Sequence, residues 1–387
     1  MTITAPSRPQ AAGASQSRAA VVTDPAVPTD RRLRRPAFAA ALTRVASAVT
    51  TPVIPAEYLD MVAPLRRGAD LRGRVVDIQP ETLDAVTVRI RPGRDWSGHT
   101  AGQYIRIGVD VEGVRHWRAY SITSPSRTAD NLVAITVKAI RDGVVSNHIV
   151  RRLRRGELVH LDQATGEFTL PPRAPGKALF VTAGSGITPV MGMLRSHLAQ
   201  LEDVVMVHSA PAAADVIFAD ELRGLAALGR LRLVERHTDT AGAMTPADLA
   251  ALCPDWQERE TWACGPTAML DDVEAHWAAA GVPERLHTER FRPTVVAAGE
   301  GGRVSFTGSR TTVDVDGATP ILDAGEGAGV LMPSGCRMGI CFGCVVPLRE
   351  GAVRDLRSGE LTTAAPGDGV RIQTCVSAAA GACEIDL

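Results

Sequence analysis

The apolar positions of the chain change their spacing along its length, and the changes divide it into segments of different kinds. Residues 1–30 are rich in Ala, Pro, Ser and Thr and show no apolar period, so we expect them to be disordered. In residues 31–69, Phe38, Leu42, Val45 and Val49 are spaced by four, three and four positions. That spacing places them on one face of a helix, which predicts a helical N-terminal extension.

The charge next to this stripe leaves two interpretations of the extension. Four arginines lie just before it, at positions 31, 32, 34 and 35. A basic amphipathic helix is typical of a segment that docks on a membrane surface or on a membrane-bound partner. A helix with one apolar stripe also commonly packs on the body of its own protein. Both interpretations stay open at this point.

From residue 70 onward the pattern alternates with a period of two, as in strands. Short alternating runs occupy residues 71–78, 85–90, 103–109 and 132–138, with Gly, Pro and Asp between them. Such spacing predicts an antiparallel β-barrel over residues 70–172.

Over residues 173–293 the pattern changes to continuous apolar strands that alternate with helical segments. Residues 178–183 form such a strand, and further apolar or helical runs cover 190–201, 204–208, 219–228, 231–235, 261–264 and 268–280. This alternation predicts a parallel α/β sheet of the Rossmann-like kind. A linker over 294–301 and a small domain over 302–387 complete a multidomain organisation.

Composition narrows the class of protein. The chain has 387 residues, of which 45% are apolar, and a formal net charge of −1. Globular domains are therefore expected, and general nucleic-acid binding is not. No apolar run reaches the roughly 20 residues that span a bilayer. The N-terminus lacks the pattern of a secretory signal, so we expect a cytoplasmic protein, with peripheral membrane contact if the basic helix docks there.

The cysteines carry the most specific chemical signal. Cys336, Cys341 and Cys344 are spaced C-x4-C-x2-C, and Cys375 follows downstream. This is the ligand spacing of a plant-type [2Fe–2S] cluster, which needs four thiolates around two irons. A structural zinc site is the alternative, although zinc sites more often use paired C-x2-C spacings. Cys383 lies beyond the ligand set, and we expect it to be a small buried residue.

A Gly-rich turn over residues 182–189 follows one predicted strand and begins a helix. Backbone N–H groups at a helix N-terminus bind anions, so this turn is a candidate site for a nucleotide pyrophosphate. A tight strand–helix turn without a ligand is the alternative. The residues that would form the site are Gly184, Gly186, Thr188 and Pro189.

Two further motifs resemble those of the ferredoxin–NADP reductase superfamily. Residues 118–121 read R-A-Y-S and residues 143–146 read G-V-V-S, on a β domain that precedes an α/β domain. The resemblance implies a flavin held by Arg118, Tyr120, Ser121, Gly143, Val145 and Ser146. It favours FAD, and FMN stays open as the alternative. The small C-terminal domain resembles a plant-type ferredoxin, which implies a β-grasp fold.

The resemblance also implies roles at the reacting centre. The turn at 184–189 is similar to the superfamily's G-x-G-x-x-P loop, and Cys264, Gly265 and Pro266 are similar to its C-G-P motif beside the nicotinamide. Ser121 is expected to reach flavin N5, and Cys264 to leave room for the nicotinamide ring. These two residues are therefore the candidate catalytic residues.

The nucleotide preference depends on the segment that reads V-E-R-H at residues 234–237. Arg236 fits the role of binding a 2′-phosphate, since a guanidinium fork matches phosphate oxygens, and this favours NADPH. Glu235 would repel a phosphate unless its side chain turns away, so NADH stays open as the alternative.

Together these motifs predict an enzyme that passes a hydride from NAD(P)H to a flavin and then single electrons to an iron–sulfur cluster. Residues 55–60 and 102–120 look most like ferredoxin reductases that serve acyl-CoA desaturases in actinobacteria, so the resemblance implies a desaturase as electron acceptor. A cytosolic oxygenase or a haem-thiolate monooxygenase is the alternative acceptor. A redox-sensing or zinc-binding protein without turnover is the alternative of another class.

Overall fold

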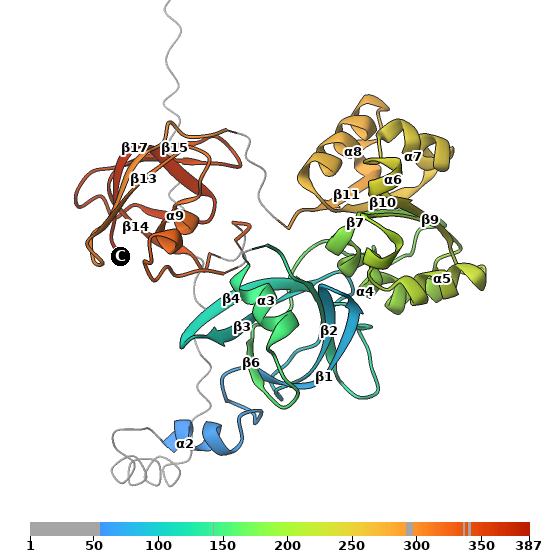
Figure 1. Cartoon of the computed structure of the whole chain (residues 1–387), viewed down its shortest axis with the longest axis horizontal. Coiled ribbons are helices and arrows are strands. Elements are labelled where there is room, and N and C mark those ends of the chain that lie inside the picture. Colours follow the sequence, from blue (N-terminus) through green and yellow to red (C-terminus); the bar gives the residue numbers. More distant parts are fainter. Residues whose placement is uncertain (1–54, 142, 292–296, 336, 340–341) are drawn as a thin grey trace, which may run out of the picture. The chain divides into compact units, whose positions relative to one another are not determined.

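We describe the protein from a computed structural model that covers residues 55–141, 143–291, 297–335, 337–339 and 342–387. The side chains of residues 55–58 are not described. The predicted disordered segment and the stripe from Phe38 to Val49 lie outside these ranges, so both stay predictions. The first described element is the short helix α2 (Pro55–Val62) (Figure 1). None of the described helices is both long enough and apolar enough to cross a membrane.

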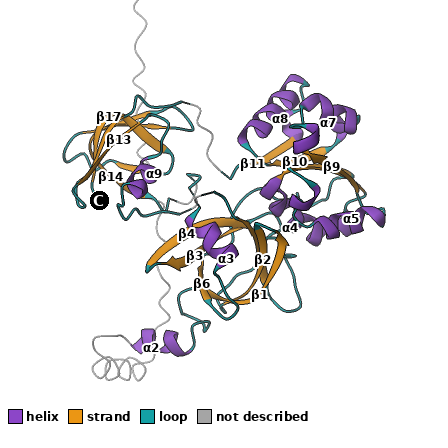
Figure 2. Cartoon of the chain, viewed as in Figure 1, coloured by secondary structure: helices purple, strands orange, loops and turns teal. Residues whose placement is uncertain are grey.

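The first domain is an antiparallel barrel of six strands in the order β4-β3-β6-β1-β2-β5 (Figure 2). Alternating apolar residues such as Val86, Val88 and Ile90 point into its core, which explains the period of two in the sequence. A bridge between Ile122 and Ile135 links the end of β4 to β5 and closes the barrel. Its elements are β1 (Arg72–Thr82), β2 (Ala85–Pro92), β3 (Tyr104–Val111), β4 (Val114–Ser121), β5 (Val133–Lys138), α3 (Val144–Arg151) and β6 (Leu158–Leu161).

The second domain is a parallel five-stranded sheet in the order β11-β10-β7-β8-β9, with helices on its faces (Figure 1). Its central strand β7 is almost wholly buried, as its continuous apolar sequence predicts. The strands are β7 (Lys177–Ala183), β8 (Asp203–Ala210), β9 (Arg232–His237), β10 (Glu260–Cys264) and β11 (Leu286–Glu289). The helices are α4 (Ile187–His197), α5 (Ala219–Ala227), α6 (Thr238–Ala241), α7 (Pro246–Leu252) and α8 (Thr267–Ala279).

Helix α4 joins these two domains. The guanidinium of Arg195 donates to the carbonyl of Thr123 over 2.8 Å, at the end of β4. Gly192 packs so closely that a Cβ there would lie 2.4 Å from the carbonyl oxygen of Ile122. A methyl group cannot approach a backbone oxygen to that distance, so glycine is required for this contact. Helix α4 therefore follows the Gly-rich turn over residues 184–189 at its N-terminus and packs against the end of β4 along its side.

The third domain has a mixed sheet in the order β13-β12-β17-β14-β15, with β16 paired to β14. Its apolar core includes Phe306, Leu322, Cys344 and Cys375. The elements are β12 (Gly302–Phe306), β13 (Thr311–Val315), α9 (Ile321–Gly327), β14 (Val345–Asp355), β15 (Leu361–Ala364), β16 (Arg371–Gln373) and β17 (Ser377–Ile385).

The sequence patterns agree closely with these elements. The strand runs predicted in the barrel coincide with β1, β2, β3 and β5, and the predicted α/β fold is confirmed. Two short strands, β6 and β11, carry too few residues to show a period. They acquire their structure from their neighbours in the sheets, β1 and β3 for β6 and β10 for β11.

Candidate flavin, nucleotide and iron–sulfur site

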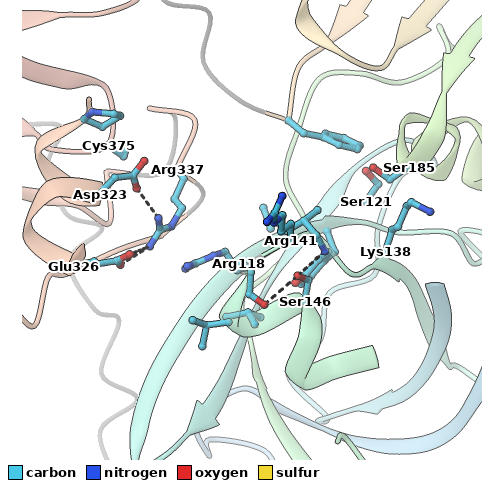
Figure 3. A pocket seen from close by; sticks show the side chains of 18 of the residues that line it. Arg118, Ser121, Lys138, Arg141, Ser146, Ser185, Asp323, Glu326, Arg337 and Cys375 are labelled. Carbon is cyan, nitrogen blue, oxygen red and sulfur yellow. Dashed lines mark hydrogen bonds and ion pairs between the residues drawn. The ribbon is translucent and has the colours of Figure 1, made fainter. Parts of the chain in front are cut away.

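The end of β4 carries the first of the three motifs. Arg118, Tyr120 and Ser121 lie on this strand, where Tyr104 of β3 pairs with Ser121. They line a cavity of about 760 Å³ (Figure 3). Ser121 is 4% exposed, and its Oγ has no hydrogen-bond partner among the described residues. A buried hydroxyl without a partner is costly, so a group bound in the cavity is expected to supply one.

The second flavin motif forms the N-terminus of α3 on the same cavity. Gly143 is the N-cap residue, and none of the described side chains caps the helix. Its first N–H groups are therefore free to bind an anion. The Oγ of Ser146 accepts the N–H of Ile140 over 3.2 Å and donates to the carbonyl of Gly143. Ser146 thus stabilises the turn before α3, while Val145 is buried in the barrel core.

Two cations and an aromatic ring outside these two motifs also line this cavity. Lys138 ends β5, Arg141 lies between β5 and α3, and Phe291 follows β11. Lys138 pairs with Asp84 over 2.6 Å. These two basic residues just before the G-x-x-S motif were the available signal in the sequence.

The two nucleotide motifs meet at the carboxyl ends of β7 and β10. Gly184 has a φ of +52°, which turns the chain out of β7. A Cβ on Gly186 would lie 2.1 Å from the carbonyl oxygen of Cys264, so the Gly-rich turn and the C-G-P motif are in direct contact. Thr188 donates to the carbonyl of Ser185 over 2.9 Å, and Pro189 is buried in the first turn of α4. Gly265 and Pro266 connect β10 to α8.

A buried thiol and a buried carboxyl are neighbours in this sheet. Cys264 on β10 pairs in register with Glu289 on β11. Burial, and then the charge of Glu289, holds the pKa of the Cys264 thiol well above its usual value, so the thiol stays protonated. Burial raises the pKa of Glu289 to about 8. Residues 289–291 read E-R-F, which resembles the stretch where the ferredoxin–NADP reductase superfamily carries an acidic or aromatic group near the flavin.

Ser121 and Glu289 also share a small cavity. Its volume is about 40 Å³, and Phe291 is among its other lining residues. The Oε2 of Glu289 has no hydrogen-bond partner among the described residues, like the Oγ of Ser121. A water molecule needs about 10–15 Å³ of such space and polar partners, and both are present. The carboxyl group of Glu289 therefore lies at the same small cavity as Ser121, a candidate catalytic residue.

The guanidinium of Arg236 is already bound to other groups of the protein, whereas a phosphate-binding side chain needs free donors. Its guanidinium donates to the carbonyls of Ala241, Gly242 and Ala243 and lies 3.4 Å from Asp248. Its neighbour Glu235 makes a two-pronged ion pair with Arg223, with both distances 2.8 Å, and a contact with His237. The hydrogen bonds from Arg223 hold the pKa of Glu235 below its usual value. The carboxylate is therefore ionised at the position where a 2′-phosphate was expected.

The expected cluster ligands that the structure describes lie together. Cys344 and Cys375 are 1% and 3% exposed, and their Sγ atoms are 3.2 Å apart without a covalent bond. Two buried thiols from distant segments suit a shared metal centre. Cys336 and Cys341 lie outside the described residues. Cys383 is buried in β17, which confirms its expected place in the core.

Comparison with protein families identifies the three parts independently. The model of the oxidoreductase FAD-binding domain matches residues 84–170, and that of the oxidoreductase NAD-binding domain matches residues 180–275. The model of the 2Fe-2S iron-sulfur cluster binding domain matches residues 304–380. These matches lie within the predicted ranges 70–172, 173–293 and 302–387, whose boundaries stay predictions. The chain therefore binds FAD, NAD(P)H and a [2Fe–2S] cluster.

Whole proteins show the same organisation. The chain is 47% identical over 354 residues to an NADPH oxidoreductase of Mycobacterium tuberculosis, covering 90% of this chain and 92% of the relative. It is 32% identical to NADH oxidoreductase HCR of Escherichia coli, covering 77% and 92%. The solved structure of phthalate dioxygenase reductase shares the fold, with a TM-score of 0.56 and 23% identity, and the match covers 82% of this chain and 97% of that one. On this evidence the chain belongs to the ferredoxin-reductase-type oxidoreductases that join FAD-binding, NAD-binding and [2Fe–2S] domains in one polypeptide.

Proposed function

We propose that this reductase is the electron-supplying component of an oxygenase system and passes single electrons to a separate acceptor protein. The proposal depends on the observation that one chain contains a candidate nucleotide site, a candidate flavin cavity and a buried cysteine pair. The flavin supplies the chemistry that converts a two-electron donor into a source of single electrons. A chain with these parts suits acceptors that take one electron at a time.

The described residues support specific roles in this function. In this proposal Arg118 and the N-terminus of α3, which share one cavity, bind the negative charge of the FAD pyrophosphate. The Ser121 hydroxyl, which lines the same cavity, donates to the flavin ring near N5. A pyrophosphate bound at the Gly186 turn would lie close to Cys264, because the two segments are in contact. Thr188 and Pro189 lie in the first turn of α4, at whose N-terminus the pyrophosphate would bind. Cys336, Cys341, Cys344 and Cys375 would ligate the cluster.

Several relatives support an oxygenase as the acceptor. Among them are a stachydrine N-demethylase reductase subunit, 29% identical, and a glycine betaine monooxygenase reductase subunit, 28% identical. The reductase component of 3-ketosteroid-9-alpha-monooxygenase in Mycolicibacterium smegmatis is 30% identical, covering 74% of this chain. These names describe the relatives, and we transfer from them only the class of acceptor.

The proposal is tested by reconstitution. The purified reductase would be combined in turn with candidate oxygenases and desaturases, with NADPH and NADH as donors, and product formation would be measured against NAD(P)H consumption. We expect coupled product formation with an oxygenase. Reduction of ferricyanide without coupling to any oxygenase would contradict the proposed acceptor class while leaving the reductase activity intact.

A membrane-bound acyl-CoA desaturase is the second candidate acceptor, favoured by one feature of the structure. Leu59, Met61 and Val62 near the end of α2 are 56%, 76% and 87% exposed. Exposed apolar residues suit contact with a membrane surface, and the basic segment 31–35 precedes them in the sequence. Deletion of residues 1–60 should then reduce desaturase coupling and leave ferricyanide reduction unchanged. Equal coupling before and after the deletion would refute the docking role.

A further inference from the structure

One backbone carbonyl of the cysteine loop is held by side chains from outside the loop. Gly339 lies between Cys336 and Cys341 in the sequence. Its carbonyl oxygen accepts Nη1 of Arg357 over 2.9 Å and Nε2 of Gln373 over 3.0 Å. The two donors come from different segments, the turn after β14 and the end of β16. The loop is therefore fixed to both segments at a single oxygen.

Glycine is what allows this approach. Gly339 has a φ of +76°, and a Cβ there would lie 2.4 Å from Nη1 of Arg357 and 2.8 Å from Cγ1 of Val376. A residue with a side chain would be strained by the backbone conformation and would also push the guanidinium away. The guanidinium and the loop thus fit each other closely.

The guanidinium itself is held in a fixed orientation. Asp355 accepts its Nε over 3.2 Å and its Nη2 over 2.7 Å, while Nη2 also donates to Oε1 of Gln373 over 3.3 Å. The Arg357 backbone N–H donates to the same carboxylate over 2.8 Å. Although 37% of the Arg357 side chain is exposed, its donors are directed by these partners. A planar fork held in this way loses little entropy on binding the loop.

The guanidinium of Arg357 also lies close to two segments that carry the expected cluster ligands. Its donors reach the carbonyl of Gly339, which lies between Cys336 and Cys341 in the sequence, and Oε1 of Gln373, two residues before Cys375. A positive charge held there favours negative charge on the site. Reduction of a cluster adds one negative charge, and a nearby cation favours the form that carries it.

We propose that Arg357 is a positioning residue of the iron–sulfur site, which fastens the cysteine loop through the Gly339 carbonyl and stabilises the reduced cluster with its charge. The inference deepens the proposed function and rests on the assignment of the four cysteines as ligands. It assigns two separable effects to one side chain: one depends on the fork of donors, and the other depends on the positive charge.

Two substitutions separate these effects. R357Q removes the charge and the fork, whereas R357K keeps the charge and loses the fork. With R357Q, the equilibrium constant for one-electron reduction of the cluster should fall about three- to tenfold, which equals about 30 to 60 mV at 59 mV per tenfold change. With R357K it should stay close to wild type. In both variants the cluster should be lost to a chelator about 10-fold faster or more, since partners of metal ligands typically change affinity by that amount.

R354Q is the matched control. Arg354 supports the same turn, donating to the carbonyl of Gly359 over 3.0 Å and pairing with Glu300 over 2.6 Å, but none of its described hydrogen bonds reaches the cysteine loop. R354Q should therefore leave both the potential and the rate of cluster loss close to wild type. The potential would be measured by redox titration followed by electron paramagnetic resonance, and cluster loss by visible absorbance with a chelator present.

The outcomes decide the proposal. Wild-type potential and wild-type cluster loss in R357Q would overturn it, as would equal effects in R354Q and R357Q. If R357Q does not assemble a cluster, R357K decides, because fast cluster loss at an unchanged potential supports the fastening role and unchanged loss refutes it. A wild-type protein without a [2Fe–2S] spectrum would instead show that the ligand assignment fails, which is a different result.

Discussion

The buried carboxyl of Glu289 gives the sharpest prediction for the chemistry of the flavin site. With a pKa of about 8, roughly nine in ten Glu289 side chains are protonated at pH 7, and roughly nine in ten are ionised at pH 9. Ionisation would place a negative charge in the cavity that Ser121 also lines. Because hydride transfer makes the flavin more electron-rich, this charge should slow flavin reduction as the pH rises through about 8.

The free energy involved follows from the same pKa. A rise from 4.5 to about 8 corresponds to an upper limit of roughly 5 kcal/mol, at about 1.36 kcal/mol per pKa unit. The protonated form is the one that the fold favours. Its stabilising contribution is therefore complete below pH 4.5 and is lost as the pH rises through about 8. The residue is half-buried although its Oε2 is enclosed, so water reduces the cost below this limit.

E289Q tests this reasoning, because it keeps the shape of the protonated acid and removes its titration. The assay is stopped-flow bleaching of the flavin by NAD(P)H from pH 6 to 10. Wild type should lose rate with an apparent pKa near 8, whereas E289Q should match wild type within about threefold at pH 6.5 and stay flat above it. E260Q is the control, since Glu260 begins β10 and binds His287 over 2.7 Å. An alkaline decline that persists in E289Q would refute the role of Glu289.

Three further predictions concern the other parts of the chain. Cys341→Ser should leave ferricyanide reduction by NAD(P)H largely intact and abolish cytochrome c reduction through the cluster, and equal loss of both activities would contradict the proposed electron order. E235Q should raise the ratio of kcat/KM for NADPH over NADH by about tenfold, since it removes an anion and releases Arg223; an unchanged ratio would exclude Glu235 from nucleotide selection. G192A should destabilise the junction of flavin and nucleotide domains by about 1–3 kcal/mol, seen as a lower flavin-release temperature, because its Cβ meets the Ile122 carbonyl; an unchanged temperature would show that the junction yields at no cost.

The fold was predictable where burial follows a regular period. The strands of the barrel alternate because only one face of each points inward, as Val86, Val88 and Ile90 show. Strand β7 is continuous in apolar residues because both of its faces are covered. The short strands β6 and β11 were not predicted, since their positions depend on pairing with distant neighbours and leave no local pattern.

The candidate site was predictable where a motif is local in the sequence. The residues of the R-x-Y-S and G-x-x-S motifs line one cavity, and the G-x-G-x-x-P turn contacts the C-G-P motif, while their roles stay predictions. The hydrogen-bond and ion-pair partners of the side chains were not predictable in this way. Arg236 turns to the carbonyls of residues 241–243, and Glu235 is paired with Arg223 from α5. The hydrogen bond from Arg357 to the Gly339 carbonyl joins residues 18 positions apart, so no local sequence motif predicts it.

The central claim is that electrons pass within one chain from NAD(P)H through FAD to the iron–sulfur cluster. Its most direct test is an anaerobic rapid-freeze experiment with the holoprotein, in which flavin absorbance and the paramagnetic signal of the reduced cluster are followed after mixing with NADPH. We expect flavin bleaching first and the cluster signal afterwards, with a total capacity of about three electrons per chain in a reductive titration. Bleaching of the flavin without any cluster signal would contradict the claim.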